Sequence, residues 1–300
     1  MSFALNAIIA LLPLTGRKRR LSSEKAVLTR VTGRVEPTAA HIPKSLSSIA
    51  DISEQTVLGR RVITVTPRSA EPQRDVVYLH GGSYLNPLVR SHWAIVRELV
   101  MRADARVTVP LYGLAPEHTA NDAYPFLTRV YEGLRTQSTG AEIVLAGDSA
   151  GGGLALAFCQ QLRDSGTPMP AGLLMIAPWL DVTLANPEAA VIEGRDPMLA
   201  IAGLRAAGRL WAGGRALEHP TVSPLFGRLR GLPPMLVVQG GRDLTAADVR
   251  ILQDRVAAGG GEIEVIFSAA AFHVFVGLPF LPEARAGWQR VEAWLRGHIG

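Results

Sequence analysis

The sequence predicts an α/β fold with a mostly parallel central sheet that helices cover on both faces. Short, continuous apolar runs alternate along the chain with longer helix-like stretches, as expected of strands buried on both faces. The chain of 300 residues is 48% hydrophobic, which is ample for one such core with an inserted cap. The expected strands are 62–66, 76–79, 106–110, 143–146, 173–177, 235–239 and 263–267, and the expected helices are 91–102, 120–135, 152–163, 246–257 and 283–298.

A Gly-Asp-Ser-Ala-Gly motif at residues 147–151 lies between an expected strand and an expected helix. A chain that reverses sharply from strand to helix holds Ser149 in a strained backbone conformation and exposes its hydroxyl at the edge of the sheet. Glycine is needed at 147 and 151 because a Cβ there would collide with the neighbouring element. The motif therefore predicts a nucleophile elbow with Ser149 as the nucleophile.

A His-Gly-Gly-Ser motif at residues 80–83 follows the strand-like run 75–79. Acyl transfer passes through a tetrahedral oxyanion, which needs backbone N–H donors about 3 Å away. A glycine-rich loop allows the backbone to approach a substrate closely, so we expect Gly82 and Ser83 to supply two donors. The N–H of Ala150, directly after the nucleophile and at a helix N-terminus, is the expected third.

The general base is sought among the histidines that follow Ser149, because in this type of fold the order is serine, acid, histidine. His298 lies at the end of a helix, where a solvated position is expected, and His219 lies in a polar turn. His273 follows a late strand and a loop of small residues, which suits an imidazole that reaches the edge of the sheet. The sequence therefore predicts His273 as the base.

The acid must lie between the serine and the histidine and hold the imidazole Nδ1–H. Asp243 comes directly after the strand 235–239, so it emerges at the same edge of the sheet as Ser149. Asp248 is the alternative, but it falls one turn into the next helix, where a surface carboxylate is expected. We expect Asp181, after another strand, to serve the structure or the pocket wall.

Taken together, these motifs resemble the hormone-sensitive lipase family of carboxylesterases, which has the α/β-hydrolase fold. The resemblance covers residues 60–300, where further family motifs are found at 112–118, 178–181, 223–226 and 272–275. It implies the same triad of Ser149, Asp243 and His273 and the same oxyanion donors. The chain departs from the family at Ser83, which stands where a third glycine is usual, at Gly113 instead of an arginine, and at 244–248, which lacks the usual Asp-Glu pair.

The predicted organisation is a core interrupted by cap segments. Residues 1–45 are expected to form N-terminal cap helices and 184–220 a cap insertion, while 46–183 and 221–300 form the two parts of the α/β-hydrolase core. Substrate-binding candidates near motif ends or in the expected cap are Tyr84, Leu85, Trp93, Trp179 and Trp211. His92 and Leu180 are further candidates for lining the site.

The N-terminal segment 3–14 is apolar and is followed by a basic cluster at 17–20. A secretory signal has its charge before the apolar run, and 12 residues are too few to span a bilayer. The apolar residues recur at helical spacing, so we expect an amphipathic helix that covers the active site. A helix lying on an anionic membrane is the alternative.

The predicted function is hydrolysis of short- to medium-chain carboxylic esters through an acyl-enzyme on Ser149. The same triad would also serve a lactonase, thioesterase, carbamate hydrolase or amidase, and a non-catalytic receptor is disfavoured because His273 is present. No metal or cofactor is expected. The net charge is +5, and the sequence shows no basic surface interleaved with aromatic residues. The expected partner is therefore a small-molecule ester and not a nucleic acid. We expect a monomer or homodimer, and the single Cys159 favours the cytoplasm.

Overall fold

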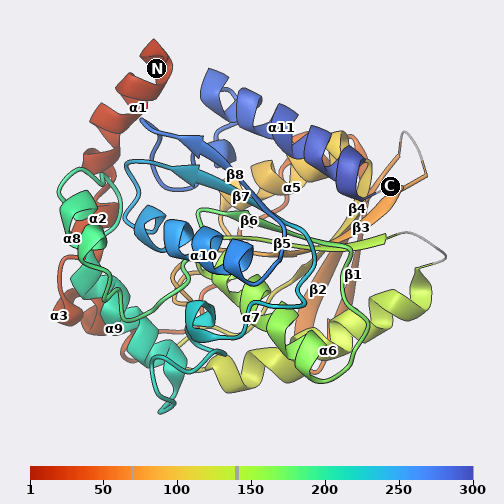
Figure 1. Ribbon diagram of the computed structural model, residues 1–300, viewed down its shortest axis with the longest axis horizontal. Coiled ribbons are helices and arrows are strands. Elements are labelled where there is room, and N and C mark those ends of the chain that lie inside the picture. The colour runs from red at the N-terminus through yellow and green to blue at the C-terminus, as the bar shows by residue number, and fades with distance from the viewer. Residues whose placement is uncertain (69–70, 139–141, 300) are drawn as a thin grey trace.

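The computed structural model describes residues 1–68, 71–138 and 142–299. In these ranges one eight-stranded sheet forms the centre of the molecule, with the strand order β1-β2-β4-β3-β5-β6-β7-β8 (Figure 1). β1 and β2 pair antiparallel, as do β2 and β4, and the remaining pairs are parallel. The strands are β1 (Ala50–Val57), β2 (Arg60–Pro67), β3 (Arg74–Leu79), β4 (Ala105–Pro110), β5 (Glu142–Asp148), β6 (Gly172–Ile176), β7 (Met235–Gly240) and β8 (Ile263–Ser268).

The prediction of a mostly parallel α/β sheet is confirmed, and each of the seven expected strands corresponds to one of these. β1 was not expected. Most of its residues are exposed and polar, and it pairs with β2 alone at the edge of the sheet. An edge strand with little buried surface has no continuous apolar run to reveal it.

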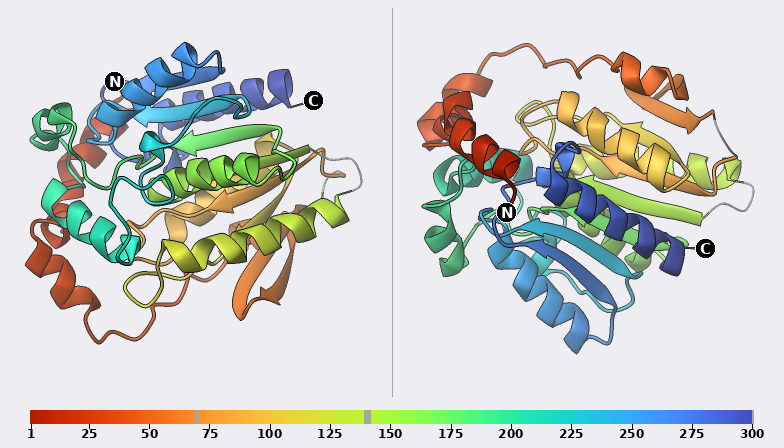
Figure 2. Two further views of the ribbon diagram at one scale, coloured as in Figure 1. Left: turned by 60° about the horizontal axis from the view of Figure 1, so that its bottom comes forward. Right: turned by 90° about the horizontal axis from the view of Figure 1, so that it is seen from above.

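Helices cover both faces of the sheet, as expected. α5 and α11 pack against each other and against strands on one face, whereas α7 and α10 pack against the other, with α6 against β1 (Figures 1 and 2). These helices are α5 (Arg90–Arg102), α6 (Ala120–Gln137), α7 (Ala150–Asp164), α10 (Ala246–Ala258) and α11 (Pro282–His298).

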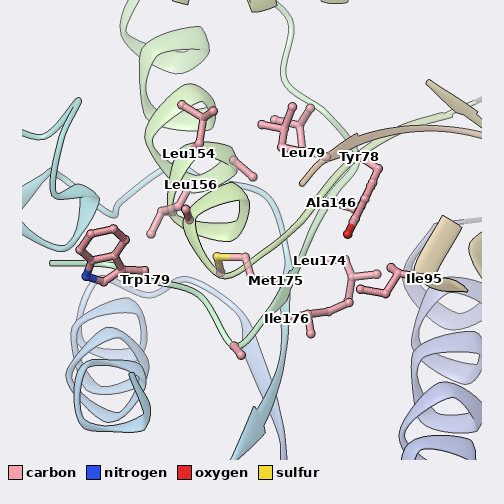
Figure 3. Close-up of a cluster of buried hydrophobic side chains, with 14 of the residues drawn as sticks. Tyr78, Leu79, Ile95, Ala146, Leu154, Leu156, Leu174, Met175, Ile176 and Trp179 are labelled. Atoms are coloured by element: carbon pink, nitrogen blue, oxygen red, sulfur yellow. The ribbon is translucent and has the colours of Figure 1, made fainter. Parts of the chain in front are cut away.

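The alternation of side chains along β6 links the two layers of helices. Leu174 and Ile176 lie beside Ile95 of α5 (Figure 3). Met175 points to the opposite side, where α7 lies. Residues at odd and even positions of a strand face opposite sides, so a strand buried on both faces needs apolar residues at every position.

The N-terminal helices lie beside the helices inserted between β6 and β7 (Figures 1 and 2). α3 packs against α9, and the N–H of Gly203 donates to the carbonyl oxygen of Leu21 at 2.8 Å. The group of N-terminal helices beside the insertion ends with α3. The next helix, α4, packs against β1 instead. The elements are α1 (Phe3–Leu11), η1 (Leu12–Thr15), α2 (Arg17–Arg20), α3 (Glu24–Val31), α4 (Lys44–Ser47), α8 (Pro187–Glu193) and α9 (Ile201–Ala212).

The expected helix near the N-terminus is present as α1, which is continued by η1; of these two elements, only Leu12 and Thr15 of η1 line the Ser149 cavity. Leu5 is fully buried, whereas Phe3 and Leu14 are largely exposed. Across the described ranges, no helix combines the length and the apolar character needed to cross a membrane.

Candidate active site

Ser149 lies at the junction between β5 and α7, in a backbone conformation with φ 53° and ψ −121°. This left-handed region is strained for a residue with a side chain. The turn is tight enough that a Cβ at Gly147 would overlap the carbonyl oxygen of Gly151, and one at Gly151 would overlap that of Leu79. The local structure is the strand–turn–helix that the motif predicts.

A chain of hydrogen bonds joins Ser149 to His273 and His273 to Asp243. The Ser149 Oγ lies 2.8 Å from His273 Nε2, and His273 Nδ1 lies 2.8 Å from Asp243 Oδ2. The serine follows β5, the aspartate follows β7 and the histidine follows β8. These strands are mutually parallel through β6, so their carboxyl ends meet at one edge of the sheet.

The carboxylate of Asp243 is held by several donors besides His273. Its Oδ1 accepts from the N–H and the hydroxyl of Thr245, and its Oδ2 accepts from Gln239 Nε2 at 2.9 Å. Burial by itself lowers the pKa of His273, but the charge and hydrogen bond of Asp243 outweigh burial and raise this pKa above its ordinary value. The arrangement stabilises an imidazolium at His273.

The other candidates for acid and base lie elsewhere. Asp248 forms a hydrogen bond with Asn186 and none with a histidine. The expectation of a surface carboxylate at Asp248 is wrong: its side chain is buried, and burial raises its pKa to about 7. His219 bonds Thr221 in an exposed turn, and His298 is an exposed residue that reaches Glu262.

The backbone N–H groups of Gly82, Ser83 and Ala150 make no hydrogen bond to another described residue. Gly82 and Ser83 adopt positive φ angles of 124° and 55°, and both line the same cavity as Ser149. Ala150 is the first residue of α7, where an N–H has no partner within the helix. The departure from glycine at 83 therefore leaves a side chain in the left-handed region without removing the N–H.

Buried polar residues fix the loop that carries Gly82. Asp148 accepts hydrogen bonds from the Tyr78 hydroxyl and from the Gly81 N–H. The ring of His80 stacks on Tyr112, whose hydroxyl donates to the His80 carbonyl oxygen. Burial and the proximity of His92 lower the pKa of His80 to about 4, so His80 is a neutral structural group.

Asp196 is a buried carboxylate near the site that the sequence analysis did not single out. Its Oδ1 accepts from the N–H groups of Met198 and Leu199, and its Oδ2 from that of Leu244. Burial and the charge of Asp243 raise its pKa to about 6. The sequence gives little indication of this burial, because Asp196 lies in the insertion, where a lone aspartate is usually solvated.

A cavity of about 340 Å³ opens on Ser149 and His273. The helical segments at the N-terminus and in the insertion contribute part of its wall, including Leu12, Leu21 and Leu199. His92, from α5, also lies in this wall.

The five substrate-binding candidates do not lie in the wall of this cavity. Tyr84 stacks on Trp211 with ring centroids 4.1 Å apart and on Trp179 at 5.7 Å. All five side chains are almost completely buried, including Leu85 and Trp93. The stack of Tyr84, Trp179 and Trp211 lies where the core meets the inserted helix α9, whereas Trp93 belongs to α5 and donates to the carbonyl oxygen of Ala40. The prediction that the five candidates line the pocket is therefore wrong.

Comparisons with known proteins agree with this geometry. A family model described as alpha/beta hydrolase fold matches residues 76–277. An acetyl-hydrolase of Streptomyces hygroscopicus is 34% identical over 229 residues, covering 76% of this chain and 77% of its own length. Esterase LipU of Mycobacterium tuberculosis is 32% identical over 275 residues, covering 89% of this chain and 91% of its own.

Solved structures show the same likeness over the whole chain. An esterase from the bacterial hormone-sensitive lipase family has a TM-score of 0.83 at 27% identity, with 100% of this chain and 99% of that chain covered. EstE5 soaked with p-nitrophenyl butyrate has a TM-score of 0.82 at 27% identity and the same coverage. The fold and the site define an α/β hydrolase. Within that class, the chain belongs to the hormone-sensitive lipase family of carboxylesterases.

Proposed function

We propose that the chain is a serine carboxylesterase that hydrolyses short- to medium-chain esters through an acyl-enzyme on Ser149. The observation that carries the proposal is the hydrogen-bonded chain from Ser149 through His273 to Asp243. The cavity at Ser149 is also lined by Gly82 and Ser83, whose backbone N–H groups have no partner among the described residues. The names of the acetyl-hydrolase and esterase relatives support the same reaction class.

In the proposed mechanism, His273 Nε2 takes the proton of the Ser149 hydroxyl as the oxygen attacks the ester carbonyl carbon. The N–H groups of Gly82, Ser83 and Ala150 donate to the oxyanion of the tetrahedral intermediate. The intermediate collapses, the C–O bond to the alcohol breaks, and His273 returns the proton to the leaving oxygen. A water molecule then attacks the acyl-enzyme by the same steps and releases the acid.

The elevated pKa of His273 has a consequence for this mechanism. The base must be neutral to accept the proton of Ser149, so activity rises with pH through the pKa of His273 in the free enzyme. Because Asp243 raises that pKa, half-maximal kcat/KM lies above the ordinary histidine value of about 6.5.

We propose that helices α1–α3 and α8–α9 act as a cap that bounds the acyl pocket. Residues of both segments lie in the wall of the cavity. A membrane-bound role for the N-terminal segment is the alternative.

The proposal is tested by treating the protein with a fluorophosphonate and measuring p-nitrophenyl butyrate hydrolysis in parallel. We expect one label at Ser149 and stoichiometric loss of hydrolysis. Absence of labelling and of turnover would contradict the proposal. Labelling without ester turnover would direct the search to lactones, thioesters and amides, because the same triad serves them.

A further inference from the structure

Three arginines lie in the wall of the Ser149 cavity: Arg17 and Arg20 from α2, and Arg30 from α3. Both helices belong to the N-terminal part of the chain. Asp148 is the one carboxylate among the described residues of that wall. Its Oδ1 accepts from the Tyr78 hydroxyl and the Gly81 N–H, and its Oδ2 lies 3.5 Å from His92 Nε2. The wall therefore carries an excess of positive charge.

The side chains of Arg17 and Arg20 make no hydrogen bond or ion pair with another described residue, and Arg30 reaches only the amide oxygen of Asn86, at 3.0 Å. Other arginines bond carboxylates, as Arg106 does with Asp75 in a bidentate contact, or backbone carbonyl oxygens, as Arg205 does with Thr183 and Leu184. What distinguishes Arg17, Arg20 and Arg30 is that three guanidinium groups without an ion-pair partner among the described residues line one cavity.

The arginines are close enough to affect one another. Partial burial and repulsion from Arg20 lower the pKa of Arg17. Partial burial, followed by repulsion from Arg20 and Arg34, lowers the pKa of Arg30. Like charges that converge in this way destabilise the empty site and are relieved by a bound anion.

Nearby carboxylates are committed to other partners. Glu24 forms an ion pair with Arg209 at 2.9 Å. Glu193 accepts from the N–H of Ile201, and Asp196 is surrounded by backbone donors. No described acidic side chain therefore forms an ion pair with Arg17, Arg20 or Arg30.

We propose that Arg17, Arg20 and Arg30 form a binding site for a carboxylate or phosphate group carried by the ester substrate, on its acyl or its alcohol part. This inference rests on the proposed esterase function, since the anion is bound while the ester lies at Ser149. Guanidinium groups suit such a ligand because they donate two parallel hydrogen bonds to a carboxylate or phosphate. Leu12, Leu21 and Leu199 in the same wall accommodate the carbon chain between the ester and the anion.

The test compares esters that differ only by the anionic group. Ethyl hexanoate is paired with monoethyl adipate, which carries a carboxylate in place of the terminal methyl. On the alcohol side, 4-methylphenyl acetate is paired with 4-acetoxyphenylacetate. The readout is the ratio of kcat/KM for the anionic ester to that for the neutral ester, measured at low salt and at 0.5 M NaCl.

We expect this ratio to exceed about ten in at least one pair at low salt. The ratio should fall at high salt, because salt screens the attraction between exposed charges. Arg17→Gln, Arg20→Gln and Arg30→Gln should each lower the ratio by roughly three- to tenfold. Arg19→Gln is the matched control: Arg19 is exposed, as are the three arginines of the site, and belongs to the same helix as Arg17 and Arg20, but it lies outside the cavity wall, so its loss should leave the ratio unchanged.

Ratios near one in both pairs would overturn the proposal, as would an equal effect of Arg19→Gln. A lipid headgroup is the other source of such an anion, so binding to phosphatidylcholine vesicles with and without phosphatidylglycerol is measured for the same variants. Vesicle binding that depends on Arg19 as strongly as on the other three arginines, with no preference among soluble esters, would replace the substrate site with a membrane surface. Failure to hydrolyse even the neutral esters would instead count against the esterase function.

Discussion

At the scale of single residues, the site depends on three side chains whose positions are fixed by different forces. The tight turn between β5 and α7 holds Ser149 in a strained backbone conformation, and Thr245 and Gln239 fix the carboxylate of Asp243. His273 is oriented by its two neighbours in the chain of hydrogen bonds. Substitutions of Ser149 and Asp243 that remove one function and preserve the shape test the roles of these two side chains.

Replacing Ser149 with Ala should abolish ester hydrolysis and leave the fold intact, because the hydroxyl contributes little to packing. Loss of a triad nucleophile typically lowers kcat by roughly 10⁴-fold or more. Steady-state kinetics with p-nitrophenyl butyrate and a circular dichroism melt check both points. A folded variant that keeps a tenth of the activity would show that Ser149 is not the nucleophile.

Replacing Asp243 with Asn should lower kcat by roughly 10³- to 10⁴-fold, because the amide holds the imidazole of His273 in the wrong tautomer. Asp248→Asn is the control, since Asp248 has no contact with His273, and its effect on kcat should be mild. Exchange of the two phenotypes would mean that the acid is misassigned.

Asp248→Asn should also stabilise the protein at high pH. Burial raises the pKa of Asp248 to about 7 in the folded state, against about 4 in the unfolded chain, so the folded state favours the protonated form. The free energy of unfolding therefore decreases as the pH rises through this window, by a few kcal/mol at most. Asparagine stays neutral, so the variant should gain in Tm over the parent at pH 8 and gain little at pH 5. Equal differences at both pH values would contradict the buried, raised-pKa state.

At the scale of elements, the N-terminal helices are joined to the rest of the chain by the packing of α3 on α9 and by specific hydrogen bonds. Ser2 bonds the carboxylate of Glu283, and Lys18 donates to the carbonyl oxygens of Glu193 and Asp196. The triad comes entirely from loops that follow β5, β7 and β8. The helices can therefore affect the pocket without building the catalytic chain.

Removal of residues 1–20 should raise KM and broaden or weaken acyl-chain selectivity, because Leu12, Thr15, Arg17 and Arg20 leave the cavity wall. Labelling by a small fluorophosphonate should survive, because the triad stays assembled. Kinetics on soluble esters and binding to anionic vesicles are measured on the same truncated protein. Unchanged kinetics with loss of vesicle binding would identify the segment as a membrane anchor and not a cap.

At the scale of the whole molecule, the cavity between core and inserted helices sets a limit on substrate size. A volume of about 340 Å³ lies at the small end of the range for ligand pockets. Each methylene buried in the pocket contributes about 0.8 kcal/mol of binding free energy. An acyl chain longer than the pocket buries no further methylenes and therefore gains nothing more.

Activity on neutral p-nitrophenyl esters should therefore peak at short to medium acyl chains and fall for long ones. The measurement is kcat/KM across a series from acetate to palmitate, with triglyceride emulsions as a separate arm. A steady rise to the longest chains, or strong activation at a lipid interface, would contradict a bounded pocket.

The sequence by itself determined the parallel sheet, because continuous apolar runs mark strands buried on both faces. It also determined the order of Ser149, Asp243 and His273 along the chain, since each follows a predicted strand and parallel strands share one edge. Tertiary structure decided what sequence spacing does not encode. It placed β1 at the edge of the sheet and buried Asp248, and it assigned Trp93, Trp179 and Trp211 to the core instead of the cavity wall. It also brought Arg17, Arg20 and Arg30 to Ser149, because only the packing of the N-terminal helices on the inserted ones brings residues more than a hundred positions apart to one cavity.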